Sequence, residues 1–156
     1  MNQARPAPVS ASKARLRLWL RLLKATRTIE AELRERLRRD HASTLPRFDV
    51  MAALSRRPEG LRMSALSGVL RVSNGNVTGI VERLVAEGLV ERRAVEGDRR
   101  AMLVRLTPVG AAQFAEMAAT HEGWIDTLLS GLTAEEAEAL SRRLEDVAQS
   151  GAKETE

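Results

Sequence analysis

The stretch that most constrains the fold is SNGNVTGIVERLVAEGL, residues 73–89, because it has the features of a short helix with both ends marked. Ser73 suits the N-cap, and Gly88 followed by Leu89 suits a left-handed C-cap with its hydrophobic contact. One side of the helix would be apolar, since the spacing i, i+3, i+4, i+7 and i+8 holds for Val77, Ile80, Val81, Leu84 and Val85. The opposite side would carry short polar side chains followed by charge, namely Gly75, Asn76, Thr78, Gly79, Glu82 and Arg83. The pattern predicts a helix anchored in a core by one face and able to approach another surface with the other; an amphipathic helix whose polar face meets only water is the alternative.

The residues before this stretch predict a helix-turn-helix. Residues 44–54, TLPRFDVMAAL, place Pro46 in a first helical turn, where it is tolerated, and an inward side of Phe48, Met51, Ala52 and Leu54. A turn at residues 56–60 is followed by a short helix over residues 64–70, and residues 71–73 lead directly into the next helix. Two short helices joined so tightly are typical of this motif, and the second is the one that reads DNA.

After Gly88 the periodicity changes to that of strands. Residues 89–94 and 101–106 form two extended runs around a charged tip, residues 95–100, which indicates a β-hairpin. A hairpin after a recognition helix is the wing of a winged helix-turn-helix. Its tip carries Asp98, Arg99 and Arg100, and we expect a minor-groove contact there, with a solvated basic turn as the alternative.

The flanking segments predict long helices. An apolar stripe from Leu16 to Leu37 repeats every three or four residues in a helix from Ser12 to about Arg39, too long to be covered by one small core, so part of it is expected to pack on a second subunit. Thr107 and Pro108 open another helix, and the TAEE run at 133–136 is a capping box that starts the last one, with Ala137, Leu140, Leu144 and Val147 inward. Residues 1–11 are expected to be a disordered arm, and residues 149–156 to fray.

Composition narrows the class of protein. At 156 residues, with no cysteine, the chain suits one domain and has no disulfide, thiol nucleophile or thiol redox switch. Residues 1–46 carry eleven Lys and Arg against four Asp and Glu, residues 47–105 eleven against seven, and residues 106–156 three against ten. A basic front half suits a polyanion, although the excess of Arg over Lys can equally reflect genomic base composition. No signal peptide, membrane span, metal set, carboxylate pair or phosphate-binding loop is visible, so we expect a cytoplasmic protein that is not an enzyme and needs no cofactor.

The order of these segments, together with VSNGNVTGIVERL, GLVER and a D-x-R wing followed by a strand and LTPxG, resembles the MarR family of bacterial transcriptional regulators over residues 12–150. The resemblance implies a mainly helical homodimer with a small β-hairpin wing on pseudo-palindromic double-stranded DNA, in which residues 12–45 and 107–150 supply dimerisation helices, residues 46–106 form the winged helix-turn-helix lobe, and residues 151–156 are a frayed end. It places DNA contacts at Ser73, Asn74, Gly75, Asn76, Thr78, Arg83, Asp98, Arg99 and Arg100, with Asp98 bracing Arg100. Gly79 stands where the family often has a larger or basic residue, and Asn76 is suited to adenine.

The pairing of TLPRFDVMAAL with VSNGNVTGIVERL resembles the branch of the family that senses aromatic acids or their coenzyme A thioesters. We expect a repressor that such a ligand releases from its operator. The ring would contact Trp19, Leu23, Phe48, Met51 and Met117, and the phosphates Arg36 and Arg38 in the run from Arg34 to Arg39. A solvated or DNA-contacting basic stretch is the alternative for these arginines, and a winged-helix protein-interaction module without sequence-specific DNA binding is the alternative function.

Overall fold

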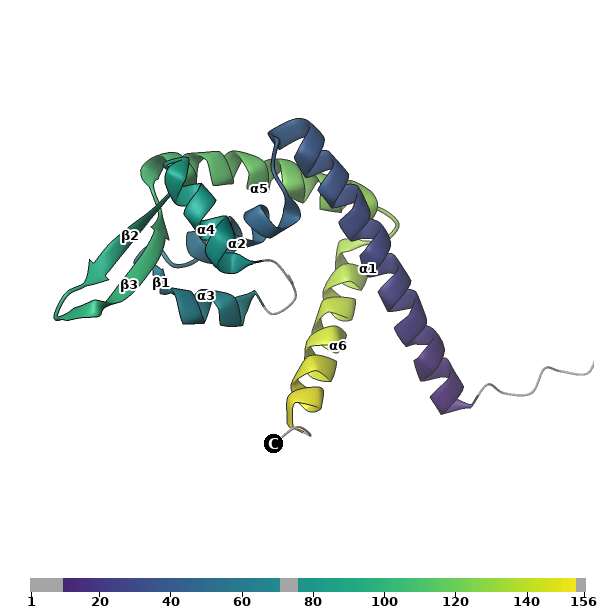
Figure 1. The fold of residues 1–156 in the computed structure, drawn as a ribbon. Helices are drawn as coiled ribbons and strands as arrows, with labels where there is room; N and C mark the ends of the chain where they lie inside the picture. The colour runs from purple at the N-terminus through teal and green to yellow at the C-terminus, as the bar shows by residue number, and fades with distance from the viewer. Residues whose placement is uncertain (1–9, 71–75, 154–156) are drawn as a thin grey trace, which may run out of the picture. The chain divides into compact units, whose positions relative to one another are not determined.

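The computed structural model describes residues 10–70 and 76–153 and confirms the mainly helical fold with a small antiparallel sheet (Figure 1). The chain divides into two compact units, Met1–Ala118 and Ala119–Glu156, a division that the sequence did not predict. Their boundary falls within α5. The elements follow in the order α1 (Ala11–His41), α2 (Leu45–Ser55), β1 (Leu61–Arg62), α3 (Met63–Val69), α4 (Val77–Ala86), β2 (Val90–Val95), β3 (Asp98–Leu106), α5 (Pro108–Leu128) and α6 (Ala134–Lys153).

Helix α1 begins one residue before the predicted start, because Ser10 caps it by accepting a hydrogen bond from the Lys13 backbone N–H at 3.4 Å. Only the C-terminal end of its apolar stripe is buried, through Leu33 and Leu37. The N-terminal part is uncovered, with Leu16, Leu18, Trp19 and Leu20 between 55% and 58% exposed. The core therefore covers only the C-terminal part of the α1 stripe and leaves the N-terminal part exposed.

The core of the first unit is built on α2. Thr44 caps the helix at the Arg47 N–H, and Pro46 lies in the first turn as predicted. The buried side chains are Phe48, Val50, Met51, Ala53 and Leu54. Ala52, predicted to face inward, is only half-buried, because it shares with Asp49 the side of the helix that the core covers least. Phe48 packs on Phe114 of α5 with ring centroids 5.4 Å apart.

The sheet has three strands in the order β1-β3-β2, all antiparallel. Strand β1 was not predicted; it is two residues long and pairs Leu61 with Val104. Gly60 precedes it with φ +101°, a conformation that L side chains rarely adopt. The hairpin tip is tighter than predicted: β3 already begins at Asp98, and the chain turns at Glu96 and Gly97, where φ of Gly97 is +83°.

Predicted caps open both C-terminal helices. Thr107 accepts the Gly110 N–H at the start of α5. At α6 the capping box closes in both directions, since Thr133 N–H donates to Glu136 at 2.8 Å and Glu136 N–H donates to the Thr133 hydroxyl at 3.2 Å. Helix α6 runs to Lys153, past the point where fraying was expected.

The stripe on α6 that was predicted to face inward lies on the surface instead, with Leu140, Leu144 and Val147 between 47% and 69% exposed. Helix α6 therefore has an apolar face that its own unit does not cover. None of the helices in residues 10–70 and 76–153 combines the length and apolar character that crossing a membrane requires.

Candidate nucleic-acid interface

Helix α4 is the predicted recognition helix, and it starts later than the sequence indicated. Its N-cap is Asn76, whose side-chain oxygen accepts the Gly79 N–H at 3.1 Å, so the prediction of Ser73 as the cap is wrong. Ser73, Asn74 and Gly75 lie outside the described residues. Val81 and Leu84 are buried as predicted, and the polar side chains expected on the opposite face are exposed: Asn76, Thr78, Glu82 and Arg83.

The cap changes what Asn76 can offer to DNA. A bidentate contact to adenine uses both the oxygen and the NH₂ group of the amide. Here the oxygen already accepts the Gly79 N–H, so the NH₂ group is the part left for a partner. The same arrangement accounts for Gly79, because a Cβ at this position would lie 3.0 Å from the Asn76 side-chain nitrogen. The small residue at position 79 makes room for the amide over the first turn.

The C-terminal end of α4 is fixed by a left-handed cap, as predicted. Gly88 has φ +74°, its N–H donates to Val85 O at 3.0 Å, and Leu89 N–H donates to Leu84 O at 2.9 Å. Next to the cap, both terminal nitrogens of Arg47 donate to the carboxylate of Glu87, which joins α2 to the end of α4. These hydrogen bonds hold the pKa of Glu87 below its ordinary value. This pair was not predicted, because its members are forty residues apart in the chain.

This ion pair predicts an acid-sensitive contribution to stability. A carboxyl whose pKa is lowered on folding stabilises the protein above its unfolded pKa, and the contribution disappears as the pH falls through the folded pKa. The Glu87→Gln variant should lose about 1 kcal/mol or less at neutral pH, since the carboxylate is half exposed. The difference from the parent protein should shrink below about pH 4.5, the ordinary value for this group.

Urea unfolding at pH 7 and at about pH 3.5 would measure the difference in free energy. Glu82→Gln is the matched control, since Glu82 lies on the same helix, is exposed, and forms no ion pair within the described residues. Equal losses for the two variants, or a Glu87→Gln loss that is independent of pH, would contradict this role for the pair.

Thr107 joins the end of α4 to the start of α5. Its hydroxyl donates to Gly88 O at 2.7 Å, and its N–H donates to Leu89 O at 3.0 Å. Gly110 lies against the same segment so closely that a Cβ would be 1.9 Å from Leu89 O. The base of the wing, the end of the recognition helix and the start of α5 therefore form one tightly bonded junction.

The wing is the β2–β3 hairpin, which extends from the helices of its unit in Figure 1. Asp98 accepts the backbone N–H of Arg100 at 3.0 Å, so the predicted bracing of Arg100 acts through the main chain. The Arg100 side chain is exposed; the Arg99 side chain lies outside what the structure describes. Near the base of the wing, Glu91 pairs with Arg105 at 2.6 Å and with Arg93 at 3.1 Å.

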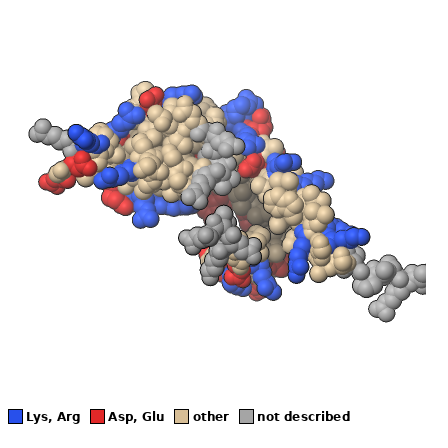
Figure 2. Space-filling model, turned by 60° about the horizontal axis from the view of Figure 1, so that its bottom comes forward, with Lys and Arg blue, Asp and Glu red and all other residues tan. Residues whose placement is uncertain are grey.

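Ion pairing separates the arginines of this unit into two sets. One set is paired with carboxylates: Arg47 with Glu87, and Arg93 and Arg105 with Glu91. Among the described residues of the winged helix, the exposed arginines without an ion pair are Arg56, Arg57, Arg62, Arg83, Arg92 and Arg100. On the face shown in Figure 2, basic side chains lie at the hairpin end of this unit and along α1, with acidic side chains among them. Arg62, the N-cap residue of α3, was missed because its position in a strand–helix junction depends on the unpredicted β1.

The side chains predicted to bind an effector differ in how far they are buried. Phe48, Met51 and Met117 are buried in the core, and Leu23 is half-buried, whereas Trp19 is 57% exposed. The run of arginines at the end of α1 is paired with carboxylates of the same helix: Arg34 with Glu30, Arg36 with Glu32, Arg38 with Glu35, and Arg39 with Asp40. Within residues 10–70 and 76–153, no group of three or more His, Asp or Glu side chains is placed to hold a metal ion.

The comparisons with known proteins all point to one family of transcriptional regulators. A MarR family model matches residues 43–101, which include α2, α3, α4 and most of the wing. The HTH-type transcriptional regulator PecS of Dickeya dadantii is 32% identical over 91 residues, covering 57% of this chain and 55% of PecS. The chain spans about half the length of two curated relatives that it matches, 55% and 56%.

Solved structures match over nearly the whole chain. The crystal structure of a MarR family transcriptional regulator from Silicibacter pomeroyi has 30% sequence identity and a TM-score of 0.75, and the match covers 92% of this chain and 99% of that one. A MarR mutant from E. coli complexed with operator DNA has 26% identity and a TM-score of 0.72, covering 89% of this chain and 99% of that one.

Proposed function

The chain belongs to the MarR family of transcriptional regulators, and we propose that it binds operator DNA in the cytoplasm as a homodimeric, ligand-responsive repressor. The observation that carries the DNA-binding part is the set of exposed arginines that have no ion pair among the described residues, on a winged helix whose recognition helix presents a polar face. The likeness to a MarR protein in complex with operator DNA supports it.

The alternative, a winged helix used only for protein contacts, is less well supported. Such a surface is typically depleted of charge at its centre, with aromatic residues in the contact. Here the exposed face of α4 ends in Arg83, and the wing carries Arg92 and Arg100 without ion-pair partners in the described part of the chain. Unpaired cations on a projecting hairpin suit a phosphate backbone or a narrow groove.

Fluorescence anisotropy with a labelled duplex from the region upstream of the gene tests the proposal. Sequence-specific binding should weaken by roughly a thousandfold between about 50 and 200 mM salt if some six phosphates are neutralised. A scrambled duplex of the same composition is the control. Equal affinity for the two duplexes, or binding that salt does not weaken, would favour the protein-interaction alternative.

The dimer is proposed from two uncovered apolar surfaces. One is the N-terminal part of α1, with Leu16, Trp19 and Leu20, and the other is the α6 stripe, with Leu144 and Val147. Exposed apolar residues in contiguous patches mark interaction sites. The N-terminal segment is basic and the C-terminal segment acidic, which suits pairing between copies.

We expect a dimer at micromolar concentration in multi-angle light scattering, reading half-sites about 10–10.5 bp apart. The Leu144→Asp variant should shift the protein toward monomer, because the new carboxylate would be buried in the interface. A parent protein that is monomeric at micromolar concentration would contradict the dimer.

The proposed signal is an aromatic acid or its coenzyme A thioester, which releases the repressor. Its support is the sequence, in which Trp19, Leu23, Phe48, Met51 and Met117 are apolar, adaptable side chains suited to a flat ring. Phosphate at Arg36 and Arg38 would have to displace Glu32 and Glu35, and an ion pair as exposed as Arg38–Glu35 is weak because water and salt screen it. Titration calorimetry with matched acids and thioesters tests this: binding of neither rejects the effector class, and equal binding of both rejects the role of the arginines.

A further inference from the structure

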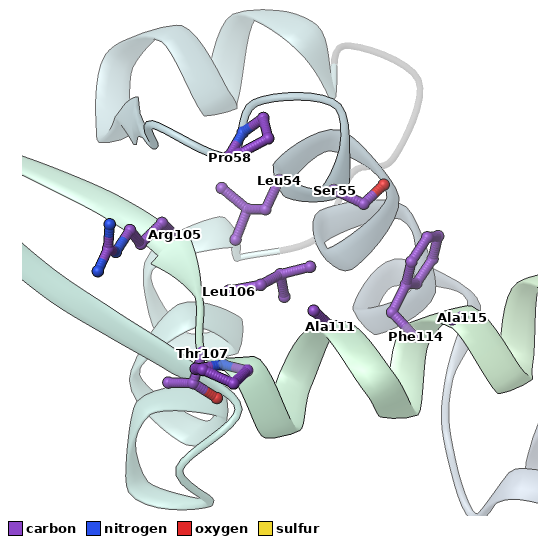
Figure 3. A pocket seen from close by; sticks show the side chains of 10 residues that line it. Leu54, Ser55, Pro58, Arg105, Leu106, Thr107, Ala111, Phe114 and Ala115 are labelled. Carbon is purple, nitrogen blue, oxygen red and sulfur yellow. The ribbon is translucent and has the colours of Figure 1, made fainter.

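The first unit contains a cavity that shares no residue with the effector site proposed above. Its volume is about 530 Å³, and it is open to solvent on one side. In Figure 3 the apolar walls come from three places: Leu54 at the end of α2 and Pro58 just after it, Leu106 at the end of β3, and Ala111, Phe114 and Ala115 on α5. Phe114 is held by its contact with Phe48.

The polar side chains around this cavity are already engaged within the protein. The Ser55 hydroxyl donates to Ala52 O at 2.8 Å, and the Thr107 hydroxyl donates to Gly88 O at 2.7 Å. Arg105 donates from Nε to Glu91 at 2.6 Å, and Figure 3 shows its guanidinium directed away from the centre of the cavity. What the cavity offers to a ligand is therefore mainly carbon surface, where a charged group would lose its hydration without a partner.

We propose that this cavity binds an uncharged, predominantly apolar compound of two or three rings. Its volume lies in the range of about 300–1,000 Å³ that is usual for sites of drug-sized ligands. It is well above the roughly 150 Å³ that accommodates a single benzene. A flat ring system would lie between Leu54 and Leu106 on one side and the α5 side chains on the other.

The position of the cavity connects its occupant to the recognition helix. Arg105, Leu106 and Thr107 form one wall, and Thr107 makes the hydrogen bonds to Gly88 and Leu89 at the end of α4. A compound that separates Leu106 from α5 would move this junction, and with it α4 and the wing. Binding therefore changes DNA affinity if the two arrangements bind the compound differently. This regulatory effect rests on the proposed DNA binding, whereas occupancy of the cavity does not.

Two probes that differ in one charged group test the chemistry. N-phenyl-1-naphthylamine is neutral, and 8-anilino-1-naphthalenesulfonate has the same rings with a sulfonate added. Fluorescence titration of the full chain should show saturable binding of the neutral probe, and at least about tenfold weaker binding of the sulfonate at this site. Equal affinity for the two probes would overturn the proposal that the site takes uncharged compounds.

Two leucine substitutions on α5 test the location. Ala111→Leu fills the cavity and should weaken binding of the neutral probe by about tenfold or more. Ala112→Leu is the control, because Ala112 is the next exposed residue on the same helix and does not line the cavity. Ala115→Leu fills the cavity from a second position, which keeps the test valid if one variant folds poorly by circular dichroism. Retained binding in a folded cavity-filling variant would overturn the location.

Operator binding measured with saturating neutral probe tests the coupling. We expect a several-fold change in the parent protein and in Ala112→Leu, and none in Ala111→Leu. Saturable probe binding that leaves operator affinity unchanged would overturn the coupling through Thr107. If the protein bound no operator at all, the proposed function would be wrong. The fluorescence titration would still show whether the cavity binds the neutral probe.

Discussion

Replacing Gly110 by alanine is expected to destabilise the protein by about 3 kcal/mol, the upper end of what overpacking usually causes. A Cβ at this position would lie 1.9 Å from the backbone oxygen of Leu89, so the added methyl group collides with main chain and not with a side chain that could rotate away. The collision cannot be relieved locally, because Leu89 O also accepts the Thr107 N–H and the Leu89 N–H is bonded to Leu84 O. Relief requires α5 to separate from the end of α4.

Thermal unfolding should report the loss as a decrease in Tm of roughly 6–12 °C, at about 2–4 °C per kcal/mol for a chain of this size. Gly68→Ala is the matched control, since Gly68 lies in helix α3 and a Cβ there meets nothing within 4 Å. It should be neutral or slightly stabilising, because alanine is the better helix former. A Gly110→Ala protein as stable as Gly68→Ala would show that the close packing of α5 on Leu89 is wrong.

Local sequence signals predicted the ends of helices well, because a cap depends on residues within four positions of one another. Thr107 with Pro108, the capping box at Thr133 and Glu136, and the left-handed Gly88 all occur as expected. At α4 the N-cap was predicted at Ser73, three residues before the residue that caps the helix, because periodicity does not mark where the first turn begins. The structure identifies Asn76 as the cap, because its side-chain oxygen accepts the Gly79 N–H.

Features that depend on distant residues were not predictable in the same way. Strand β1 is two residues long and exists only because β3 supplies its partner, Val104 for Leu61. The Arg47–Glu87 pair joins residues that no local pattern connects. The cavity behind Leu106 likewise needs the ends of α2, β3 and α5 together.

Periodicity also could not say which apolar stripes this chain covers. A stripe on α2 and a stripe on α6 look alike in the sequence, yet Met51 is buried and Val147 is 69% exposed. The difference is the presence of a partner surface, which lies elsewhere in the chain for α2. For α6 we have proposed a second copy. Of the residues proposed to contact DNA, Thr78, Arg83 and Arg100 are exposed as expected. The exposed Arg62 and Arg92 were not singled out, because their positions depend on the sheet.

Removing the Arg100 side chain is expected to weaken operator binding by about 1–3 kcal/mol, roughly 5–150-fold, without changing stability. Arg100 is exposed, lies three residues after Gly97 of the hairpin turn, and has no ion-pair partner among the described residues, so its charge is available to a narrow minor groove. The Asp98 carboxylate accepts the Arg100 backbone N–H at 3.0 Å, which fixes the direction in which the Arg100 side chain leaves the strand. The Asp98→Ala variant should therefore also lose affinity, by a smaller factor, because Arg100 keeps its charge but not its orientation.

Arg93→Ala provides the comparison on the same hairpin. Arg93 is exposed as well, but it is paired with Glu91 at 3.1 Å, so a phosphate or base would gain less from it. Anisotropy titrations at several salt concentrations separate the two arginines: Arg100→Ala should reduce the slope of log affinity against log salt by about one, and Arg93→Ala by less. If the two variants lost equal affinity, the wing would act as a diffuse positive surface; if neither lost any, the hairpin would not contact DNA. A loss concentrated at Arg100 is the result expected for a side chain that leaves a braced strand and has no ion pair in the described part of the chain.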